Sequence, residues 1–148
     1  MIKSIVVGTD GSDTAKKAVQ EAAELASAVG AEINVVSAFV PVPSQRLREE
    51  SRTAPSDIQY EITPREDVDA MLDDAEEALK KANVASIKKH AREGDPADAI
   101  LDVAEEQGAD LIVVGNKGMS GAKRFLLGSV PNKVSHHAPC SVLIVRTT

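Results

Sequence analysis

Short runs of β-branched residues alternate with longer amphipathic segments along the chain, and this alternation limits the possible folds more than any other feature of the sequence. Four runs are rich in valine and isoleucine and too short for helices, which is typical of buried strands. They occupy residues 5–7, 33–36, 111–114 and 142–145. A weakly alternating run at residues 84–91 predicts a fifth strand.

The segments between these runs carry the start and stop signals of helices. The first spans residues 13–29 and is followed by Gly30, a favoured helix stop. The second starts at the capping box of residues 63–66, which has proline at its first helical position. The third begins at Asp95 and ends at Gly108. Apolar residues at helical spacing are predicted to pack on the sheet: Ala15, Ala18, Val19, Ala22, Ala26, Val29, Val68, Met71, Leu72, Ala75, Leu79, Ala82, Ala97, Ile100, Leu101 and Ala104.

The order of these elements predicts one α/β domain over residues 1–148. Strands and helices alternate, and right-handed crossovers between parallel strands place helices on both faces of one sheet. A length of 148 residues is usual for a single domain. The connection at residues 40–62 is long for such a fold and suits a lid, a contact for a partner or simply a mobile segment.

The composition argues against several functions. The net charge of −6 opposes binding to nucleic acid or to an anionic membrane, and the three aromatic residues offer little surface for stacking bases. No apolar run approaches the roughly 20 residues of a membrane-spanning helix. The start of the chain does not resemble a signal peptide, and the single cysteine, Cys140, fits a reducing compartment. We therefore expect a cytoplasmic protein.

A glycine-rich segment after the fourth strand carries the strongest functional signal. Gly115 and Gly118 are followed, after nine residues, by Gly128 and Ser129 at the start of a further predicted helix. Glycines let a backbone approach a ligand closely, and the unpaired N–H groups of a helix N-terminus attract anions. The segment is neither a Walker P-loop nor a Rossmann fingerprint. It predicts a binding site for a phosphorylated ligand.

This spacing resembles the ATP-binding motif of the universal stress protein family, and every position of that motif matches. The similarity extends over nearly the whole chain, through residues 6–12 and 94–96 to residues 142–145. It implies a Rossmann-like sheet of the adenine nucleotide alpha hydrolase type, with five parallel strands in the order 3-2-1-4-5. It also implies that ATP, with or without Mg²⁺, binds at the carboxyl ends of strands one and four, where the strand order reverses.

The resemblance assigns ligand contacts by position. Thr9 and Asp10 are expected on the adenosine side, and Ala38 beside the base. The residues expected around the ribose and phosphates are Gly115, Asn116, Gly118, Met119, Gly128, Ser129 and Val130. Asp10 and Ser12 also have an ordinary structural explanation, because an Asx-turn and a helix cap need no ligand.

The chain departs from the usual family pattern near the phosphates. Lys117 stands where many members have histidine, and Met119 where many have a basic residue. Pro131 removes one N–H group from the first helical turn, although Lys123 and Arg124 can add positive charge. AMP and cyclic AMP are therefore alternative ligands to ATP.

Catalysis has less support than binding. No nucleophile, base and orienting residue can be assembled from the sequence, so we assign no catalytic residues. A slow ATPase or phosphotransferase, including one that phosphorylates itself, is the alternative, and a nucleotide-free scaffold is a third. His136, His137 and Cys140 lack the spacing of a metal site, His90 is interpreted as a surface residue, and Gly8 as part of a turn.

The last strand suggests how the protein associates. In the family order it lies at the edge of the sheet, and an apolar edge exposes backbone groups that pair with another chain. We expect a homodimer formed through residues 140–146, which begin at Cys140 and end at Arg146.

Overall fold

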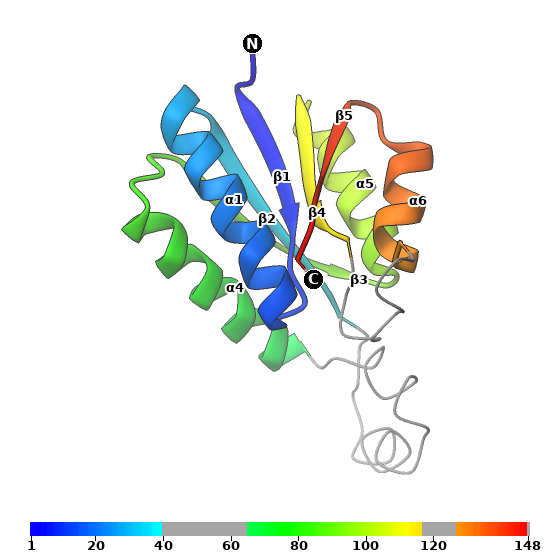
Figure 1. Ribbon diagram of the computed structural model, residues 1–148. Coiled ribbons are helices and arrows are strands. Elements are labelled where there is room, and N and C mark those ends of the chain that lie inside the picture. Colours follow the sequence, from blue (N-terminus) through cyan, green and yellow to red (C-terminus); the bar gives the residue numbers. More distant parts are fainter. Residues whose placement is uncertain (40–64, 117–126, 148) are drawn as a thin grey trace.

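Five parallel strands form one sheet in the order β3-β2-β1-β4-β5 (Figure 1). The computed structural model describes residues 1–39, 65–116 and 127–147. The strands are β1 (Ser4–Gly8), β2 (Glu32–Phe39), β3 (Ile87–Glu93), β4 (Leu111–Gly115) and β5 (Ser141–Val145). This confirms the expected order, including the weakly patterned strand β3.

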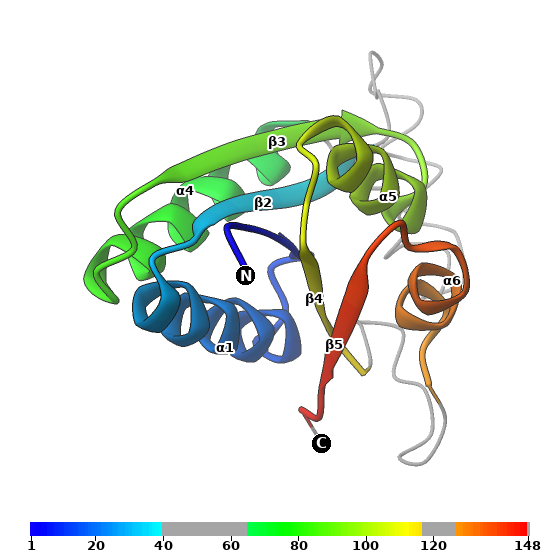
Figure 2. The same ribbon diagram turned by 90° about the horizontal axis from the view of Figure 1, so that it is seen from above.

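Helices cover both faces of the sheet (Figure 2). Helices α1 (Asp13–Val29) and α4 (Arg65–Lys81) pack on one face. Helices α5 (Pro96–Glu106) and α6 (Ser129–His137) pack on the other. Successive residues of a strand point to opposite faces, so the central strands β1 and β4, which are covered on both faces, are continuous hydrophobic runs. No helix among the described residues is long and apolar enough to cross a bilayer.

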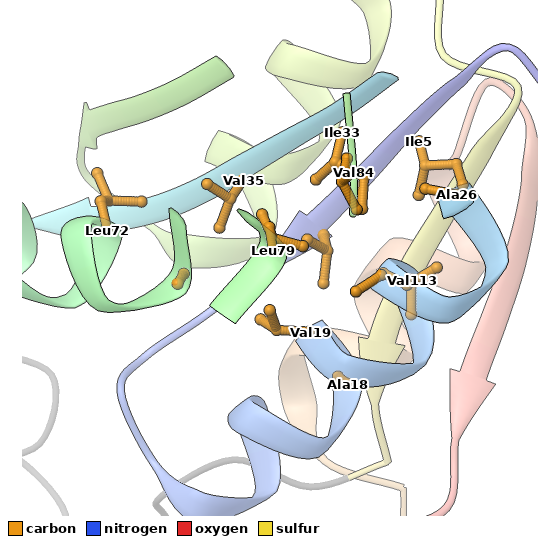
Figure 3. Packing of buried hydrophobic residues seen from close by; sticks show 14 of the residues in the cluster. Ile5, Ala18, Val19, Ala26, Ile33, Val35, Leu72, Leu79, Val84 and Val113 are labelled. Atoms are coloured by element: carbon orange, nitrogen blue, oxygen red, sulfur yellow. The ribbon is translucent and has the colours of Figure 1, made fainter. Parts of the chain in front are cut away.

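The core between α1, α4 and the sheet is built from small residues on α1 and larger ones elsewhere (Figure 3). Ala18 and Ala26 of α1 are at most 1% exposed and let the helix lie close to Ile5 and Val113 of the strands. Leu79 of α4 is fully buried and fills the remaining space. Each fully buried aliphatic side chain contributes about 1.5–3 kcal/mol relative to exposure.

The helix ends follow the predicted chemistry with small shifts. Gly30 ends α1 with a left-handed φ of 74°. Helix α5 ends at Glu106, slightly earlier than predicted, and Gly108 follows with φ 60°. Val29 was expected on the buried face, but it is 45% exposed because α1 ends there, beyond the edge of the core. The capping box of residues 63–66 lies mostly outside the described residues.

Gly8 has a different role from the turn that its sequence context suggested. It is the last residue of β1, and a Cβ atom there would lie 2.5 Å from Ile100 Cδ1 of α5. Glycine at this position therefore allows the strand and the helix to pack closely, and a larger residue would force the buried Ile100 side chain to shift.

Candidate functional site

The residues predicted to bind a ligand gather at the carboxyl edge of the sheet, between β1 and β4. These strands are parallel neighbours, with Val7 beside Val113. After β1 the chain turns to α1 on one face, whereas the chain after β4 leads on to α6 on the other. The connections thus diverge at this point, and such a switch point leaves a crevice outside the strand ends.

The turn from β1 to α1 is fixed by its own polar side chains. Thr9 Oγ1 accepts a hydrogen bond from Gly11 N at 3.2 Å, and Asp10 Oδ1 accepts one from Ser12 N at 2.9 Å. Gly11 adopts a left-handed φ of 78°, which a side chain would strain, and Met71 of α4 lies against it. The predicted Asx-turn is therefore present, and it presents Thr9 and Asp10 at the edge of the sheet.

The neighbouring strand β2 supplies Ala38 and anchors the turn. Thr9 N donates to Val36 O at 2.9 Å, and Ser37 Oγ donates to Thr9 O at 2.7 Å. Ala38 is half-buried near the carboxyl end of β2, on the face covered by α5 and α6. Thr9, Asp10 and Ala38 therefore lie at the same edge of two adjacent strands.

Asn116, the first residue after β4, is hydrogen-bonded within the protein through its backbone N–H, its carbonyl oxygen and its side-chain oxygen. Its N–H donates to Val145 O, and its carbonyl oxygen accepts from Gly128 N, both at 2.9 Å. Its side-chain Oδ1 accepts from Thr147 N and from Thr147 Oγ1, each at 2.8 Å. The side-chain oxygen of Asn116 and the N–H group of Gly128, both at positions expected to border the ligand, therefore take part in bonds within the protein.

Helix α6 begins at this edge without a side-chain cap. Its N-cap residue is Gly128, with φ −64° and ψ 164°, whereas Ser12 caps α1 and Asp95 caps α5 through their side chains. The first-turn N–H groups of Ser129 and Val130 have no acceptor within the helix, and Pro131 has no N–H. Within the described residues, two N–H groups at the positive end of α6 therefore lack an acceptor in the helix, an arrangement that can bind an anion.

Several predicted contacts lie outside the described residues. These are Gly118 and Met119 of the expected site, together with Lys117, Lys123 and Arg124. Sequence reasoning also missed two residues at this edge, Thr147 and Lys17, whose Nζ donates to Thr147 O at 3.2 Å. No local pattern reveals them, because 130 positions separate Lys17 from Thr147.

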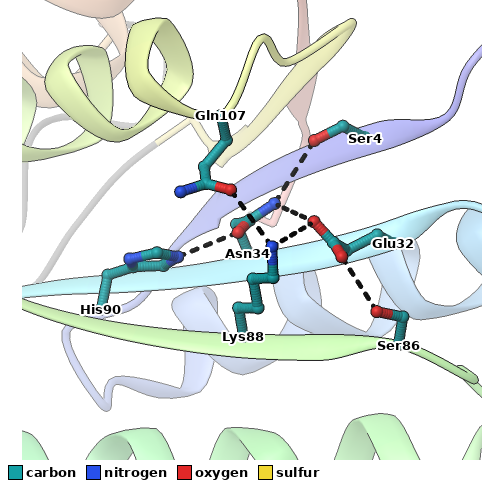
Figure 4. Close-up of polar contacts among 7 residues, drawn as sticks. All are labelled: Ser4, Glu32, Asn34, Ser86, Lys88, His90 and Gln107. Carbon is teal, nitrogen blue, oxygen red and sulfur yellow. Dashed lines mark hydrogen bonds and ion pairs between the residues drawn. The ribbon is translucent and has the colours of Figure 1, made fainter.

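A second polar cluster lies toward the opposite, amino-terminal end of the sheet (Figure 4). At its centre is Asn34 of β2, which is fully buried. Its Oδ1 lies 2.9 Å from His90 Nε2, and its Nδ2 donates to Ser4 Oγ and Glu32 Oε1, each at 3.3 Å. No buried side-chain polar atom among the described residues lacks a hydrogen-bond partner. Polar groups in this cluster satisfy one another, as a buried network requires.

His90 was interpreted as a surface residue, and this is only partly right. Its ring is half-buried against Asn34. Burial lowers the pKa of His90 from its ordinary value of 6.5, and the positive charges of Arg92 and Lys88 lower it further. Arg92 is itself held in a bidentate pair by Glu106 of α5, with N–O distances of 2.9 and 2.6 Å. A neutral His90 therefore fits its surroundings best.

The cysteine and the histidine pair lie at and just after the end of α6. Burial raises the pKa of the half-buried Cys140 thiol, which disfavours the nucleophilic thiolate. The rings of His136 and His137 are 6.5 Å apart at the end of α6. In the part of the chain that the structure describes, no three His, Cys, Asp or Glu side chains are grouped closely enough to hold a metal ion.

Comparison with known proteins gives one consistent family. The model of the universal stress protein family matches residues 1–146. Universal stress protein Rv1636 of Mycobacterium tuberculosis is 40% identical over 148 residues, which cover 99% of this chain and 97% of the relative. The similarity therefore spans both polar clusters and all five strands.

Solved structures agree with the sequence comparison. A universal stress protein crystallised in complex with cAMP is 34% identical, with a TM-score of 0.74 and coverage of 99% of this chain and 98% of that one. A universal stress protein from Archaeoglobus fulgidus in complex with dAMP is 30% identical, with a TM-score of 0.65 and coverage of 98% and 99%. With a family model that matches residues 1–146 and a relative that is 40% identical over almost the full length, this chain belongs to the universal stress protein family.

Proposed function

We propose that the protein binds an adenine nucleotide, with ATP as the leading ligand, in the crevice between the carboxyl ends of β1 and β4. One observation carries this proposal. Among the helices whose N-caps are described, α1 and α5 are capped by side chains and α6 is not, and α6 begins beside the switch point. An uncapped helix N-terminus at such a point suits a phosphate group. The complexes of related proteins with cAMP and dAMP support an adenine ligand.

The proposed roles follow from the position of each residue. Thr9 and Asp10 contact the adenosine, and Ala38 lies against the base. The N–H groups of Ser129 and Val130, with the Ser129 hydroxyl, bind phosphate oxygens, and Mg²⁺ accompanies ATP. Gly115 lets the ligand approach the end of β4. In the segment outside the described residues, Gly118 and Met119 border the ribose and phosphates.

AMP and cyclic AMP are the second candidate ligands, and a specific observation favours them. Gly128 N–H is already bonded to Asn116 O, and Pro131 has none, so the first turn of α6 offers the N–H groups of Ser129 and Val130. A single phosphate needs fewer donors than a triphosphate. Both ligands named for the related structures carry one phosphate.

Binding rather than turnover is the proposed activity. In this view nucleotide occupancy regulates a stress response, and ATP is at most hydrolysed or transferred slowly. A phosphotransferase or ATPase predicts phosphate release that is lost in Asp10→Ala or Ser129→Ala. A scaffold that binds no nucleotide predicts no effect of either change. The single domain and the cytoplasmic location stay predictions.

We also propose a homodimer through β5. The two edges of the sheet differ, because β3 carries Lys88, Lys89 and Arg92, whereas β5 carries Val142, Leu143 and Ile144. Charged residues protect an edge strand from pairing, and apolar residues do not. Leu143 is 39% exposed in the single chain. Leu143→Lys is expected to yield monomers in analytical ultracentrifugation, whereas a dimer of unchanged stability would refute this interface.

Calorimetric titration with ATP, ADP, AMP and cyclic AMP tests the central proposal. Mass spectrometry of any ligand released from freshly purified protein identifies the nucleotide bound in the cell. Ser129→Ala is expected to weaken nucleotide binding about tenfold by removing one phosphate contact. Ser135→Ala on the same helix is the matched control, since Ser135 bonds within the helix to Asn132 O. Absence of binding to the wild type at millimolar nucleotide would refute the proposal.

A further inference from the structure

The end of the chain is part of the edge at which the candidate site lies. Figure 1 marks the C-terminus just after β5, whose last residue, Val145, pairs with Gly115 at the end of β4. Thr147 is only 6% exposed, although it is the penultimate residue. Its N–H and its hydroxyl both donate to Asn116 Oδ1 at 2.8 Å, and its carbonyl oxygen accepts from Lys17 Nζ at 3.2 Å. Chain termini are ordered only where such bonds hold them.

Asn116 connects this terminus to the first turn of α6. Its backbone N–H bonds to the end of β5, at Val145 O, and its carbonyl oxygen receives the N–H of Gly128, the N-cap of α6. One residue therefore joins the end of β4, the end of β5, the C-terminal residues and the helix that offers the phosphate donors. Among the described residues, the hydrogen bond from Gly128 N to Asn116 O links the start of α6 to the end of β4.

This link matters because hydrogen bonds to phosphate form only over a narrow range of distances. Backbone N–H groups bind oxygen effectively only within about 2.7–3.2 Å and near a straight angle. A shift of α6 by a fraction of an ångström would weaken both donors, at Ser129 and Val130, together. Binding energy from such groups depends on their being held in place before the ligand arrives.

We propose that Asn116 and Thr147 form a C-terminal latch that positions the N-terminus of α6 for the phosphate of the bound nucleotide. In this proposal, which rests on the proposed function, the side-chain oxygen of Asn116 serves the protein rather than the ligand. The N–H and the hydroxyl of Thr147 both donate to that side chain and so hold Asn116 in place. The backbone carbonyl oxygen of Asn116 in turn accepts the N–H of Gly128. Both are positioning residues, and the C-terminal residues become part of the nucleotide site.

A purely structural role makes a different prediction from a positioning role. If the latch only stabilised the fold, its loss would lower the affinity for every ligand alike, or for none. If it positions α6, its loss weakens contacts to phosphate and leaves contacts to adenosine unchanged. The comparison of ATP with adenosine therefore separates the two roles.

The principal test is Thr147→Val, which keeps the size of the side chain and removes its hydroxyl donor. We expect the affinity for ATP to fall about threefold to tenfold, with the affinity for adenosine unchanged. Thr147→Ser should restore wild-type affinity because it keeps the hydroxyl. Asn116→Ala should reduce ATP affinity further, since it removes the acceptor of both Thr147 donors. Asn132→Ala, an exposed asparagine on α6, is the matched control and should bind normally.

Amide hydrogen exchange of Gly128 gives a readout that needs no nucleotide. Its N–H donates to Asn116 O, so loss of the latch should speed its exchange while the exchange of central β1 amides stays unchanged. Equal losses for ATP and adenosine, or unchanged exchange at Gly128, would overturn the latch. If the wild type binds no nucleotide, the proposed function fails, and the exchange of Gly128 alone decides whether the terminus holds α6.

Discussion

Polar residues cluster at both ends of the sheet, but their hydrogen bonds differ. Toward the amino end, Asn34 bonds to Ser4, Glu32 and His90, and the cluster closes on itself. At the carboxyl end, Asn116 is also bonded by the protein, but it supports the start of α6, whose first N–H groups have no acceptor in the helix. The polar groups of the amino-end cluster thus bond to one another, whereas the carboxyl end includes the uncapped helix start at which we propose that the ligand binds.

The direction of the chain explains this difference. In a parallel sheet with helical crossovers, helices begin at the carboxyl ends of strands and end near the amino ends, so one edge collects N–H donors and positive dipole ends. Side chains cap two of these helices, through Ser12 Oγ to Ala15 N at 3.1 Å and Asp95 Oδ2 to Asp98 N at 3.0 Å. Gly128 leaves α6 without such a cap. Among the described N-caps at this edge, that of α6 therefore differs from those of α1 and α5 in providing no side-chain acceptor for the first turn.

The largest expected effect comes from giving α6 the cap that it lacks. In Gly128→Asp, a carboxylate would accept the first-turn N–H groups and repel phosphate, and the φ of −64° suits a side chain. Nucleotide affinity should fall on the order of a hundredfold, measured by calorimetry, with the fold retained by circular dichroism. Binding that survives in a folded variant would remove α6 from the site.

Breaking the amino-end cluster should lower the stability of the protein and leave nucleotide binding unchanged. Asn34→Ala leaves the partners of a fully buried amide unsatisfied, and it should lower the free energy of unfolding by about 2–3 kcal/mol in urea denaturation. Nucleotide affinity should stay unchanged. Ser86→Ala, at the exposed margin of the cluster, is the control and should cost far less. A loss of affinity without a loss of stability would show that the cluster is functional.

The side-chain cap of α1 at the carboxyl edge should contribute to stability, as the amino-end cluster does, because its hydrogen bond is made within the protein. Ser12→Ala removes the cap of α1 and should lower the free energy of unfolding by about 1 kcal/mol. Ser12→Asp should keep most of that stability in the same urea experiment. A destabilisation from Ser12→Asp equal to that from Ser12→Ala would mean that the hydroxyl does not act as a cap.

The smallest expected effect is a dependence of stability on pH that arises from His90. Its pKa lies below the ordinary 6.5, so between these two values the unfolded chain binds more protons than the folded protein. Stability from His90 is complete above pH 6.5 and falls as the pH drops toward the folded pKa. His90→Gln should flatten the change in unfolding free energy between about pH 7.5 and about pH 5.5. An unchanged slope would exclude His90 as its source.

Carboxylates act in a separate, more acidic window. Asp110 Oδ2 accepts hydrogen bonds from Lys3 N and Ser4 N at 2.8 and 3.0 Å, and these hold the pKa of Asp110 below its ordinary value of 3.8. Its contribution is present above pH 3.8 and is lost as the pH falls below that. The two windows do not overlap, so the contribution of His90 can be measured separately.

Most of the fold could be predicted because local patterns and topology agree. The Val- and Ile-rich runs became β1, β2, β4 and β5 with boundaries shifted by a few residues. Strand β3 gave only a weak signal because Lys88, His90 and Arg92 replace the apolar residues of one face. Those residues pair with Gln107, Asn34 and Glu106, contacts that depend on tertiary structure.

The candidate site was predicted less completely, for the same physical reason. Turn chemistry at Thr9 and Asp10 is local, and it could be read from neighbouring residues. The bonds of Asn116 to Thr147 and Gly128 join distant segments, and the sequence shows no trace of them. The close contact between Gly8 and Ile100 was missed because a glycine at a strand end also suits a turn.

Amide chemical-shift mapping with ATP tests most directly whether the carboxyl edge alone binds the nucleotide. The comparison of the two ends predicts shifts for residues 9–11, for Ala38, for Gly115 and Asn116, and for the start of α6 at Ser129 and Val130. Amides of Ser4, Asn34 and His90 should remain unchanged. Shifts centred on the amino-end cluster, or no shifts at saturating ATP, AMP and cyclic AMP, would contradict the assignment of function to the carboxyl edge.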